Sequence, residues 1–243
     1  MAEIEMEHLF FSYDGERDVL TDVSFSVESS ETVGLIGANG AGKSTILKLL
    51  VGLVSGYRGN VRVNGMDAEK KNYKKIREKT GYVFQDSESQ LFLSTVYEDV
   101  AFGPKNYGYS REETEQRTME ALSQVHMEEF RDQQIYRLSG GQKKLAAIAS
   151  ILSLQPEIIL FDEPTIALDP KNRQNLIDII NNMKGTKIIA SHDLDMIFDT
   201  CERTILLSDR TVVCDGRTSE ILTDERLLEE NGLKLPLSFS RRS

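Results

Sequence analysis

Stretches in which hydrophobic and polar residues alternate are interspersed along the chain with short runs that are hydrophobic throughout. Alternation over Ile4–Phe10 and over Leu20–Glu28 predicts two strands, and we expect the first to lie at the edge of a sheet. Thr32–Ile36 predicts a further strand. The hydrophobic runs Glu157–Asp162 and Lys187–Ala190 predict strands in the centre of a parallel sheet, because both of their faces would be buried.

The region from Asp86 to about Leu154 differs from the rest in being dominated by acidic helical segments. Ser110, followed three residues later by Glu113, has the form of a capping box and predicts a helix start. We interpret this region as a helical subdomain inserted into the sheet domain. Its expected helices are Thr95–Phe102, Ser110–Gln124 and Ser139–Leu154.

The remaining segments complete an alternation of strands and helices. Lys43–Val51 and a segment opened by Pro170 predict helices that pack on the sheet. Glu69–Lys79 predicts a solvated surface helix, with a basic contact to a membrane or partner as the alternative. We also expect a strand at Thr80–Phe84, a hairpin of Arg203–Leu207 with Thr211–Cys214, two short helices, and a loose tail at Leu235–Ser243.

Alternating strands and helices of this kind predict an α/β fold with a parallel sheet. The length of 243 residues suits one large domain, or one domain with a subdomain. We expect residues 1–85 and 156–216 to form the core with its strands, residues 86–155 the helical subdomain, and residues 217–243 the C-terminal helices and tail.

The overall charge bears on which classes of macromolecule can bind this protein. The net charge is −10, and an acidic chain is a poor non-specific binder of nucleic acid, so we expect no nucleic-acid partner. No run approaches 18 consecutive apolar residues, so no transmembrane segment is predicted. If the protein works at a membrane, a partner has to hold it there.

The segment Gly37–Ser44, which reads GANGAGKS, has the composition of a phosphate-binding loop. It follows a predicted strand and opens a predicted helix, which is the context that such a loop requires. Glycines let backbone N–H groups turn toward phosphate oxygens, and the start of the helix adds its positive dipole end. Lys43 can reach the β- and γ-phosphates of a nucleoside triphosphate, and the Ser44 hydroxyl can ligate Mg²⁺. The nucleotide-binding residues predicted here are Gly37, Asn39, Gly40, Gly42, Lys43, Ser44 and Thr45.

Two adjacent acids end a predicted central strand. The carboxyl ends of parallel strands meet at one edge of a sheet, so Asp162 and Glu163 should lie beside the glycine loop. Asp162 can hold the Mg²⁺ shell, and Glu163 can polarise an attacking water. The simpler alternative is an ordinary turn at Asp162-Glu-Pro.

The segment Leu138–Gln142, which reads LSGGQ, predicts a second anion-binding helix start. Ser139 is a candidate N-cap, and the glycines leave backbone N–H groups open. One chain would then have two phosphate-reading sites. Head-to-tail pairing of two protomers would explain this, because each site would be built from both chains.

Taken together, these segments resemble the ATP-binding cassette (ABC) ATPases from Met6 to about Cys214. The resemblance implies a P-loop NTPase (RecA-like) core with an antiparallel β subdomain and an inserted α-helical subdomain. It implies hydrolysis of ATP with Mg²⁺ by a homo- or heterodimer. Gly37–Ser44 matches Walker A, Leu138–Gln142 the signature, and Ile158–Glu163 Walker B with the catalytic glutamate.

The same resemblance assigns roles to further residues. Gln85 matches the Q-loop glutamine and joins the catalytic and metal-binding set, and His192 matches the switch histidine. Tyr13 matches the aromatic residue that stacks on adenine, and Asp169 lies in the D-loop match at Ala167–Asp169. Ser139, Gly141 and Gln142 of one protomer would face the nucleotide held by Lys43 of the other. The chain departs from the family's pattern at Ile166-Ala167 and at Lys143-Lys144-Leu145, and neither departure removes a catalytic group.

The segment Tyr82–Pro104 is similar to the ATPases of energy-coupling factor (ECF) transporters of the cobalt/nickel type. This implies a motor subunit on the cytoplasmic face of the membrane, bound to a transmembrane coupling protein and a small substrate-capture membrane protein. Gln90, Leu91 and Phe92 would lie where the coupling protein is gripped, although Leu91-Phe92 could equally be core of the subdomain. A conventional ABC importer or exporter, a soluble ABC ATPase acting on nucleic acid or ribosomes, and a regulatory protein with a dead site are the alternatives.

Overall fold

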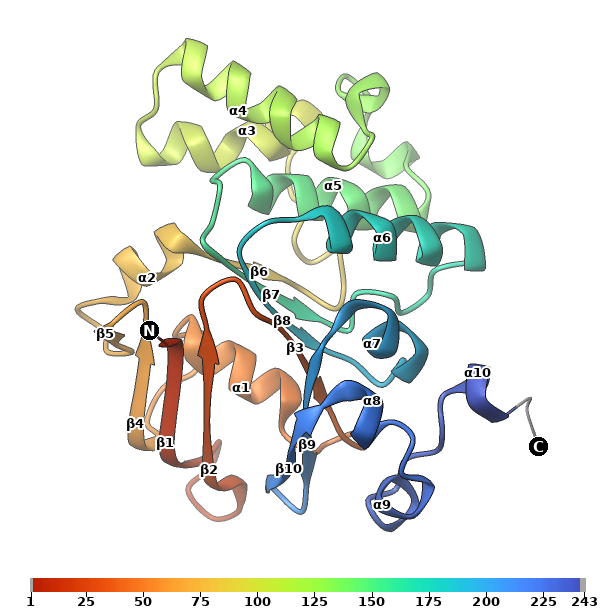
Figure 1. The fold of residues 1–243 in the computed structure, drawn as a ribbon. Coiled ribbons are helices and arrows are strands. Elements are labelled where there is room, and N and C mark those ends of the chain that lie inside the picture. The colour runs from red at the N-terminus through yellow and green to blue at the C-terminus, as the bar shows by residue number, and fades with distance from the viewer. Residues whose placement is uncertain (1, 241–243) are drawn as a thin grey trace.

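The computed structural model describes residues 2–240, and these form two sheets with helices around them (Figure 1). The first sheet has four strands in the order β2-β1-β4-β5, and the second has six strands in the order β10-β9-β3-β8-β7-β6. The strands are β1 Ala2–Ser12, β2 Asp18–Glu28, β3 Thr32–Ile36, β4 Arg58–Val63, β5 Met66–Asp67, β6 Thr80–Val83, β7 Ile158–Asp162, β8 Thr186–Ala190, β9 Arg203–Ser208 and β10 Thr211–Arg217.

Parallel pairing places the carboxyl ends of β3, β7 and β8, and the loops that follow these strands, at one edge of the six-stranded sheet. The strands β9, β3, β8, β7 and β6 pair in parallel, and β10 adds an antiparallel edge. The first sheet is antiparallel throughout. This mixed architecture confirms the expected α/β core with an antiparallel β subdomain and a helical region, and β7 and β8 are interior strands as their sequences predict.

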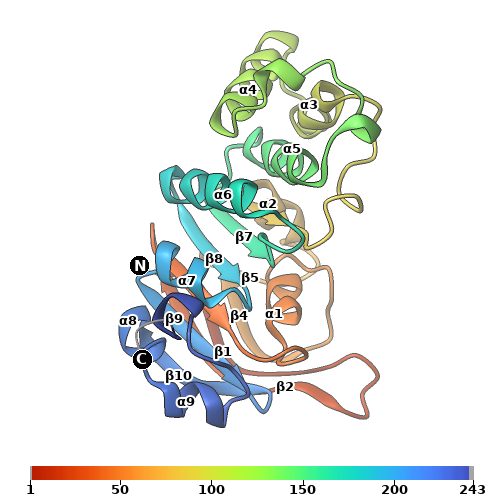
Figure 2. The same cartoon turned by 90° about the vertical axis from the view of Figure 1, so that its right-hand side faces the viewer.

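Most helices lie on one side of the six-stranded sheet. In Figure 1, α3, α4 and α5 stand above the sheet, with α6 between them and the strands, and the view in Figure 2 shows the same layering edge-on. The helices are α1 Lys43–Leu50, α2 Tyr73–Lys79, α3 Val96–Tyr107, α4 Arg111–Gln124, α5 Gly140–Leu152, α6 Pro170–Asn182, α7 Leu194–Thr200, α8 Thr218–Ile221, α9 Glu225–Glu230 and α10 Leu237–Ser240, with 3₁₀ turns at Glu128–Phe130 and Ile135–Arg137.

The two faces of the six-stranded sheet belong to different parts of the core. Phe161 of β7 and Ile189 of β8 pack in a cluster that includes α3, α4, α5 and α6. Their neighbours Leu160 and Ile188 point the other way, into a cluster with α1 and the four-stranded sheet. The period-two alternation of strand side chains therefore ties the helical region and the antiparallel sheet to opposite faces.

Several sequence-based expectations are wrong in detail. The first strand, expected at an edge, lies between β2 and β4, because its polar side chains face solvent while both of its backbone edges are paired. The helix expected to end at Phe102 continues through Pro104 to Tyr107, since Pro104 is buried against its neighbours. The helix expected over Glu69–Lys79 begins only at Tyr73.

The tail expected to be loose is held in place over its described part. The backbone N–H groups of Leu237 and Ser238 donate to the carboxylate of Asp195, at 2.9 and 3.0 Å. Phe239 packs edge-on against Phe198, with ring centroids 4.9 Å apart. Residues 241–243 of the expected tail lie outside the described residues. None of the helices in residues 2–240 has the combination of length and apolar composition that a transmembrane segment needs.

Candidate functional site

The loop between β3 and α1 forms an anion-binding cradle. Gly37 has φ 151° and Gly42 has φ 103°, both in the region that favours glycine. A Cβ atom on Gly37 would stand 2.3 Å from the Leu207 carbonyl oxygen, so the backbone needs glycine there. Within residues 2–240, no side chain caps the first turn of α1, and that turn carries no acidic residue. Its N–H groups and dipole are therefore available to an anion.

Lys43 points into this loop from the first turn of α1. Its Nζ donates to the carbonyl oxygens of Gly37 at 2.8 Å and Ala38 at 3.4 Å. The side chain is buried, and burial lowers its pKa, while the nearby carboxylates of Glu163 and Asp162 act in the opposite direction. Its hydrogen bonds within residues 2–240 go to carbonyl oxygens, and the Glu163 carboxylate stands 3.8 Å away, so the ammonium is well suited to receive the negative charge of a phosphate.

Two strand-end acids stand beside the loop. The Ser44 hydroxyl donates to Asp162 Oδ1 at 2.8 Å, and the buried Tyr82 hydroxyl donates to Asp162 Oδ2 at 2.8 Å. Glu163 follows with φ 48°, and its Oε1 lies 3.8 Å from Lys43 Nζ. The parallel register of β7 with β8 brings these acids to the edge where the glycine loop begins.

His192 reaches the same acid from the end of β8. Its Nδ1 lies 2.7 Å from Glu163 Oε2, and its backbone N–H and the Ser191 hydroxyl both donate to that oxygen at 3.2 Å. The next residue, Asp193, caps α7 and is held by Arg173 at 2.6 and 2.8 Å. Burial works against the charge of Asp193, but the Arg173 guanidinium brings its pKa below the ordinary value. The carboxylate thus fixes the backbone that presents His192.

Tyr13 lies beside the loop as well. Its hydroxyl is 3.1 Å from Thr45 Oγ1, and its ring packs edge-on against Phe11 while remaining 58% exposed. An exposed aromatic face next to a phosphate cradle can stack on a nucleotide base. The other predicted loop residues, Asn39 and Gly40, form the exposed tip of the loop.

Other predicted site residues lie apart from this group. Ser139 caps α5, as expected, in a capping box with Gln142, and Gly141 packs against Asn172 of α6. Asp169 caps α6 through its bond to the Asn172 N–H. Among the described residues, no hydrogen bond joins Ser139–Gln142 or Asp169 to the glycine loop. A chain in isolation therefore assembles only part of the predicted site.

The Q-loop position is held through its backbone. Lys144, buried on α5, donates to the carbonyl oxygens of Phe84 at 3.1 Å and Gln85 at 2.7 Å. The Gln85 side chain is exposed and, within the described part of the chain, makes no hydrogen bond to Ser44 or Asp162. Gln90 adds a second tie to α5, since its amide donates to the Ala147 carbonyl at 2.6 Å.

Three contacts of this site were missed by the sequence-based reasoning: those of Tyr82, Lys144 and Arg173. Each acts on a residue far away in sequence, respectively Asp162, the Phe84–Gln85 backbone and Asp193. The only local signal was the unusual Lys143-Lys144-Leu145 after the signature, where Lys144 proves to be the buried one.

A nucleotide cradle, a strand-end carboxylate pair and a histidine on a parallel sheet define a nucleoside-triphosphate-binding protein of the P-loop class. Residues 20–166 match the family model described as ABC transporter, so the chain belongs to the ABC transporter family and is an ATPase of it. It is 42% identical to a putative ABC transporter ATP-binding protein of Geobacter sulfurreducens, covering 97% of this chain and 95% of that protein. It is 43% identical to the energy-coupling factor transporter ATP-binding protein EcfA of Carboxydothermus hydrogenoformans, covering 96% and 87%.

A solved structure has the same fold. The structure of cbiO1 from Clostridium perfringens, described as part of the ABC transporter complex cbiONQ, superimposes with a TM-score of 0.85. It is 29% identical in sequence and covers 94% of both chains. The likeness spans the core, the antiparallel sheet and the helical region together, so the chain is an ATP-binding subunit of an ABC transporter.

Proposed function

We propose that this chain is the ATP-hydrolysing motor subunit of an ECF-type importer of a metal ion such as cobalt or nickel, or of a vitamin. The likeness to EcfA and to cbiO1 supports this choice over a conventional importer or exporter. The observation that carries it is the exposed Phe92, in the segment that resembles the ECF group. Phe92 is 63% exposed, whereas its neighbour Leu91 is buried.

Hydrolysis follows from the position of Glu163. Its carboxylate lies between Lys43 and His192, at the mouth of the phosphate cradle. From there it can accept a proton from a water that attacks the γ-phosphate, while Lys43 receives the charge on the phosphate. His192 holds the carboxylate in place and can contact the γ-phosphate.

The oxygens of Ser44 and Asp162 fit a magnesium ion. They lie 2.8 Å apart, and both belong to the hard oxygen donors that Mg²⁺ prefers. The Ser44 hydroxyl can donate its proton to Asp162 while its lone pairs face a cation. Bound Mg²⁺ would neutralise charge on the β- and γ-phosphate oxygens. We assign Gln85 to the same metal, since its exposed side chain is available.

Completion of the site requires a second ATPase, identical or homologous. Gly140 is exposed with open space around it, and Ser139 caps the start of a helix of 13 residues. In a head-to-tail dimer, Ser139 and Gly141 would face the nucleotide held by Lys43 and Tyr13 of the other chain. Asp169 lies on the Ser139 side, because Asn172 contacts both Asp169 and Gly141. ATP binding would close the dimer and hydrolysis would open it, which converts binding energy into movement.

The membrane partner would sit on the aromatic surface beside the Q-loop. The rings of Phe92 and Phe102 meet edge-on at 4.9 Å, and Phe102 is also exposed. A cavity of about 390 Å³ adjoins them, lined by Leu91, Leu93 and Tyr136 among others. Exposed aromatic residues around a groove are typical of a protein-binding surface. A transmembrane coupling protein docked there would hold the ATPase on the cytoplasmic face of the membrane.

The test is purification of the tagged chain from its native membranes in mild detergent. We expect a coupling membrane protein together with one small membrane protein, whose bound ligand identifies the cargo. Recovery with a pair of large permeases would instead indicate a conventional transporter. Recovery only with nucleic acid or ribosomes in the soluble fraction would refute the transport function.

A further inference from the structure

Tyr82 is a buried residue on β6, the edge strand that pairs in parallel with β7. It lies opposite Leu160, and its side chain lies on the α1 face of the sheet with that residue. Asp162, two residues beyond Leu160, projects from the same face. The Tyr82 hydroxyl reaches it with a hydrogen bond of 2.8 Å, and the tyrosine is only 6% exposed.

The Asp162 carboxylate is held by one hydroxyl on each oxygen. Ser44 donates to Oδ1 and Tyr82 donates to Oδ2, both at 2.8 Å. A carboxylate with one donor can still turn about its terminal bond, whereas two donors on opposite oxygens fix its plane.

We propose that Tyr82 is a positioning residue for the metal-binding carboxylate, and that it sets the affinity of the site for the magnesium–nucleotide complex. This inference rests on the magnesium site proposed above. With Oδ2 occupied by Tyr82, the plane of the carboxylate is fixed so that Oδ1 faces Ser44. Without the phenol, the bond from Ser44 would remain, but the carboxylate could turn about its terminal bond, so its plane would no longer be fixed. The cost would fall on metal-dependent binding, since the glycine loop and Lys43 are untouched.

A purely structural function of the phenol makes a different prediction. Tyr82 also packs edge-on against Phe84, with centroids 4.8 Å apart, and this contact needs the ring but not the hydroxyl. Tyr82→Phe keeps the ring and removes only the bond to Asp162. If the phenol only satisfied a buried acceptor on Asp162, the variant would lose stability, but the Mg²⁺ requirement for nucleotide binding would stay the same.

The experiment compares nucleotide affinity with and without metal. Displacement of a fluorescent ATP analogue is measured in EDTA and over a Mg²⁺ titration for native protein and Tyr82→Phe. For Tyr82→Phe, we expect the nucleotide affinity in EDTA to stay within about twofold of native. The Mg²⁺ concentration for half-saturation should rise about tenfold, which corresponds to the loss of one hydrogen bond to a charged group. Tyr73→Phe is the matched control, since Tyr73 is similarly buried and its hydroxyl donates to the Ala68 carbonyl at 2.7 Å, away from the loop.

The outcomes separate this inference from the proposed function. An unchanged Mg²⁺ requirement in Tyr82→Phe, with a raised one in Ser44→Ala, would overturn the inference alone. A native protein whose nucleotide affinity does not respond to Mg²⁺ would overturn the metal site itself. If Tyr82→Phe does not fold, 3-fluorotyrosine at position 82 gives a second readout. Its ¹⁹F resonance should shift when Mg²⁺ is added to nucleotide-loaded protein, and an unmoved resonance would count against the inference.

Discussion

At the residue scale, contacts to neighbouring residues hold the Glu163 carboxylate in position and still leave it able to accept a proton. One oxygen accepts from His192 and its backbone, and the other lies 3.8 Å from Lys43. The backbone there adopts φ 48°, which is uncommon for a residue with a side chain. The glutamate side chain is therefore positioned by residues that directly follow β8 and by Lys43 on α1.

We expect Glu163→Gln to reduce ATP hydrolysis by at least about 100-fold, because the amide cannot accept a proton from water. ATP binding should persist, since the loop and Lys43 are intact, and the closed dimer should accumulate. Phosphate release and gel filtration with ATP measure these effects. Lys43→Ala serves as the contrast, with loss of nucleotide affinity itself. A Glu163→Gln protein that hydrolyses ATP at the native rate would refute the function assigned to this glutamate.

Lys144 makes stability depend on pH. Burial lowers its pKa from 10.5 to about 8, and Asp86 and Asp162 oppose this shift. Between about pH 8 and 10.5 the unfolded chain keeps a proton on this lysine that the folded chain has released. The free energy of unfolding should therefore rise with pH across that window, by at most about 3 kcal/mol.

Urea unfolding at pH 7.5 and 9.5 tests this dependence. Lys144→Met is expected to be less stable than native, because the carbonyls of Phe84 and Gln85 lose their donor. It should also gain about 1–2 kcal/mol less than native protein between the two pH values. Other lysines are common to both proteins and cancel. Equal gains would show that Lys144 is not the group responsible.

Site residues can be identified from the sequence where the residues that act together are also close together along the chain. The glycine loop, the acids after a hydrophobic run and LSGGQ can each be read within a few positions. Tyr82 and Lys144 could not be found that way. Their partners are brought to them by the pairing of β6 with β7 and by the packing of α5, neither of which leaves a local pattern.

At the scale of elements, the pattern of hydrophobic and polar residues predicts whether a segment is a helix or a strand better than it predicts where that element lies in the fold. Strands β3, β7 and β8 and the capped helix starts at Ser110 and Ser139 agree with the structure. The position of β1 inside its sheet depends on its pairing with β4, which is distant in sequence, and alternation cannot reveal that partner. The C-terminal segment is ordered by Asp195 on α7, a contact made across the fold.

We expect Asp195→Ala to release that segment without affecting the core. Two hydrogen bonds to the backbone of Leu237 and Ser238 would be lost, at about 1 kcal/mol each. Amide hydrogen exchange at these two positions should accelerate several-fold, while β7 and β8 remain protected. Asp199→Ala, on the same helix, is the control. Unchanged exchange would mean that the contact of Phe239 with Phe198 is sufficient to hold the segment.

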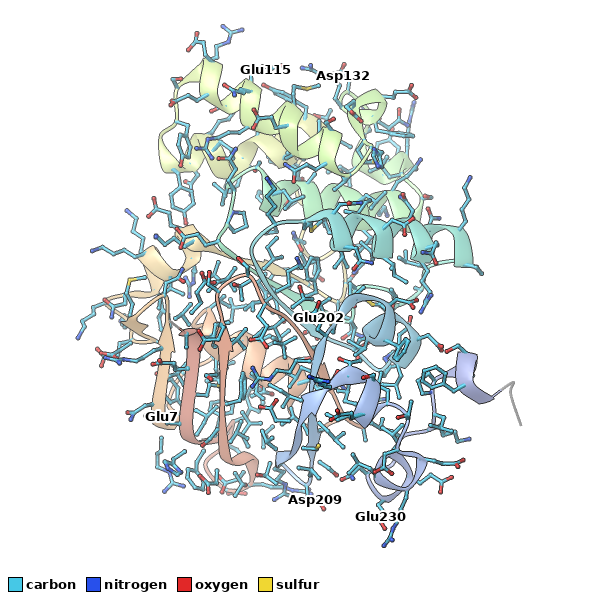
Figure 3. All side chains as sticks on the ribbon, in the orientation of Figure 1. Glu7, Glu115, Asp132, Glu202, Asp209 and Glu230 are labelled. Carbon is cyan, nitrogen blue, oxygen red and sulfur yellow. The ribbon has the colours of Figure 1, made fainter. Side chains whose placement is uncertain are left out.

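For the whole molecule, charge and shape favour a protein partner over nucleic acid. The labelled acids in Figure 3 include Glu7 on β1, Glu115 on α4 and Glu230 on α9, so acidic groups occur on the antiparallel sheet, the helical region and the C-terminal helices. With a net charge of −10, this distribution is unfavourable for a phosphate backbone. The exposed aromatic pair of Phe92 and Phe102 on the helical region fits the alternative, a hydrophobic protein surface.

Lys144 and Gln90 tie the segment that carries Phe92 to the helix that carries the signature. A partner that moves Phe92 would therefore move α5 with it. A substitution of Phe92 can then test docking of the partner separately from ATP hydrolysis.

We expect Phe92→Ser to keep ATP binding and basal hydrolysis within about twofold, because the ring is largely exposed. Its affinity for the membrane partner should fall about 30-fold, as for a central aromatic anchor, measured by the fraction that co-purifies from membranes. Leu237→Ser, at a still more exposed apolar position on α10, should leave co-purification unchanged. If Phe92→Ser co-purifies as well as native protein, the coupling protein does not dock beside the Q-loop, and its binding surface lies elsewhere on the ATPase.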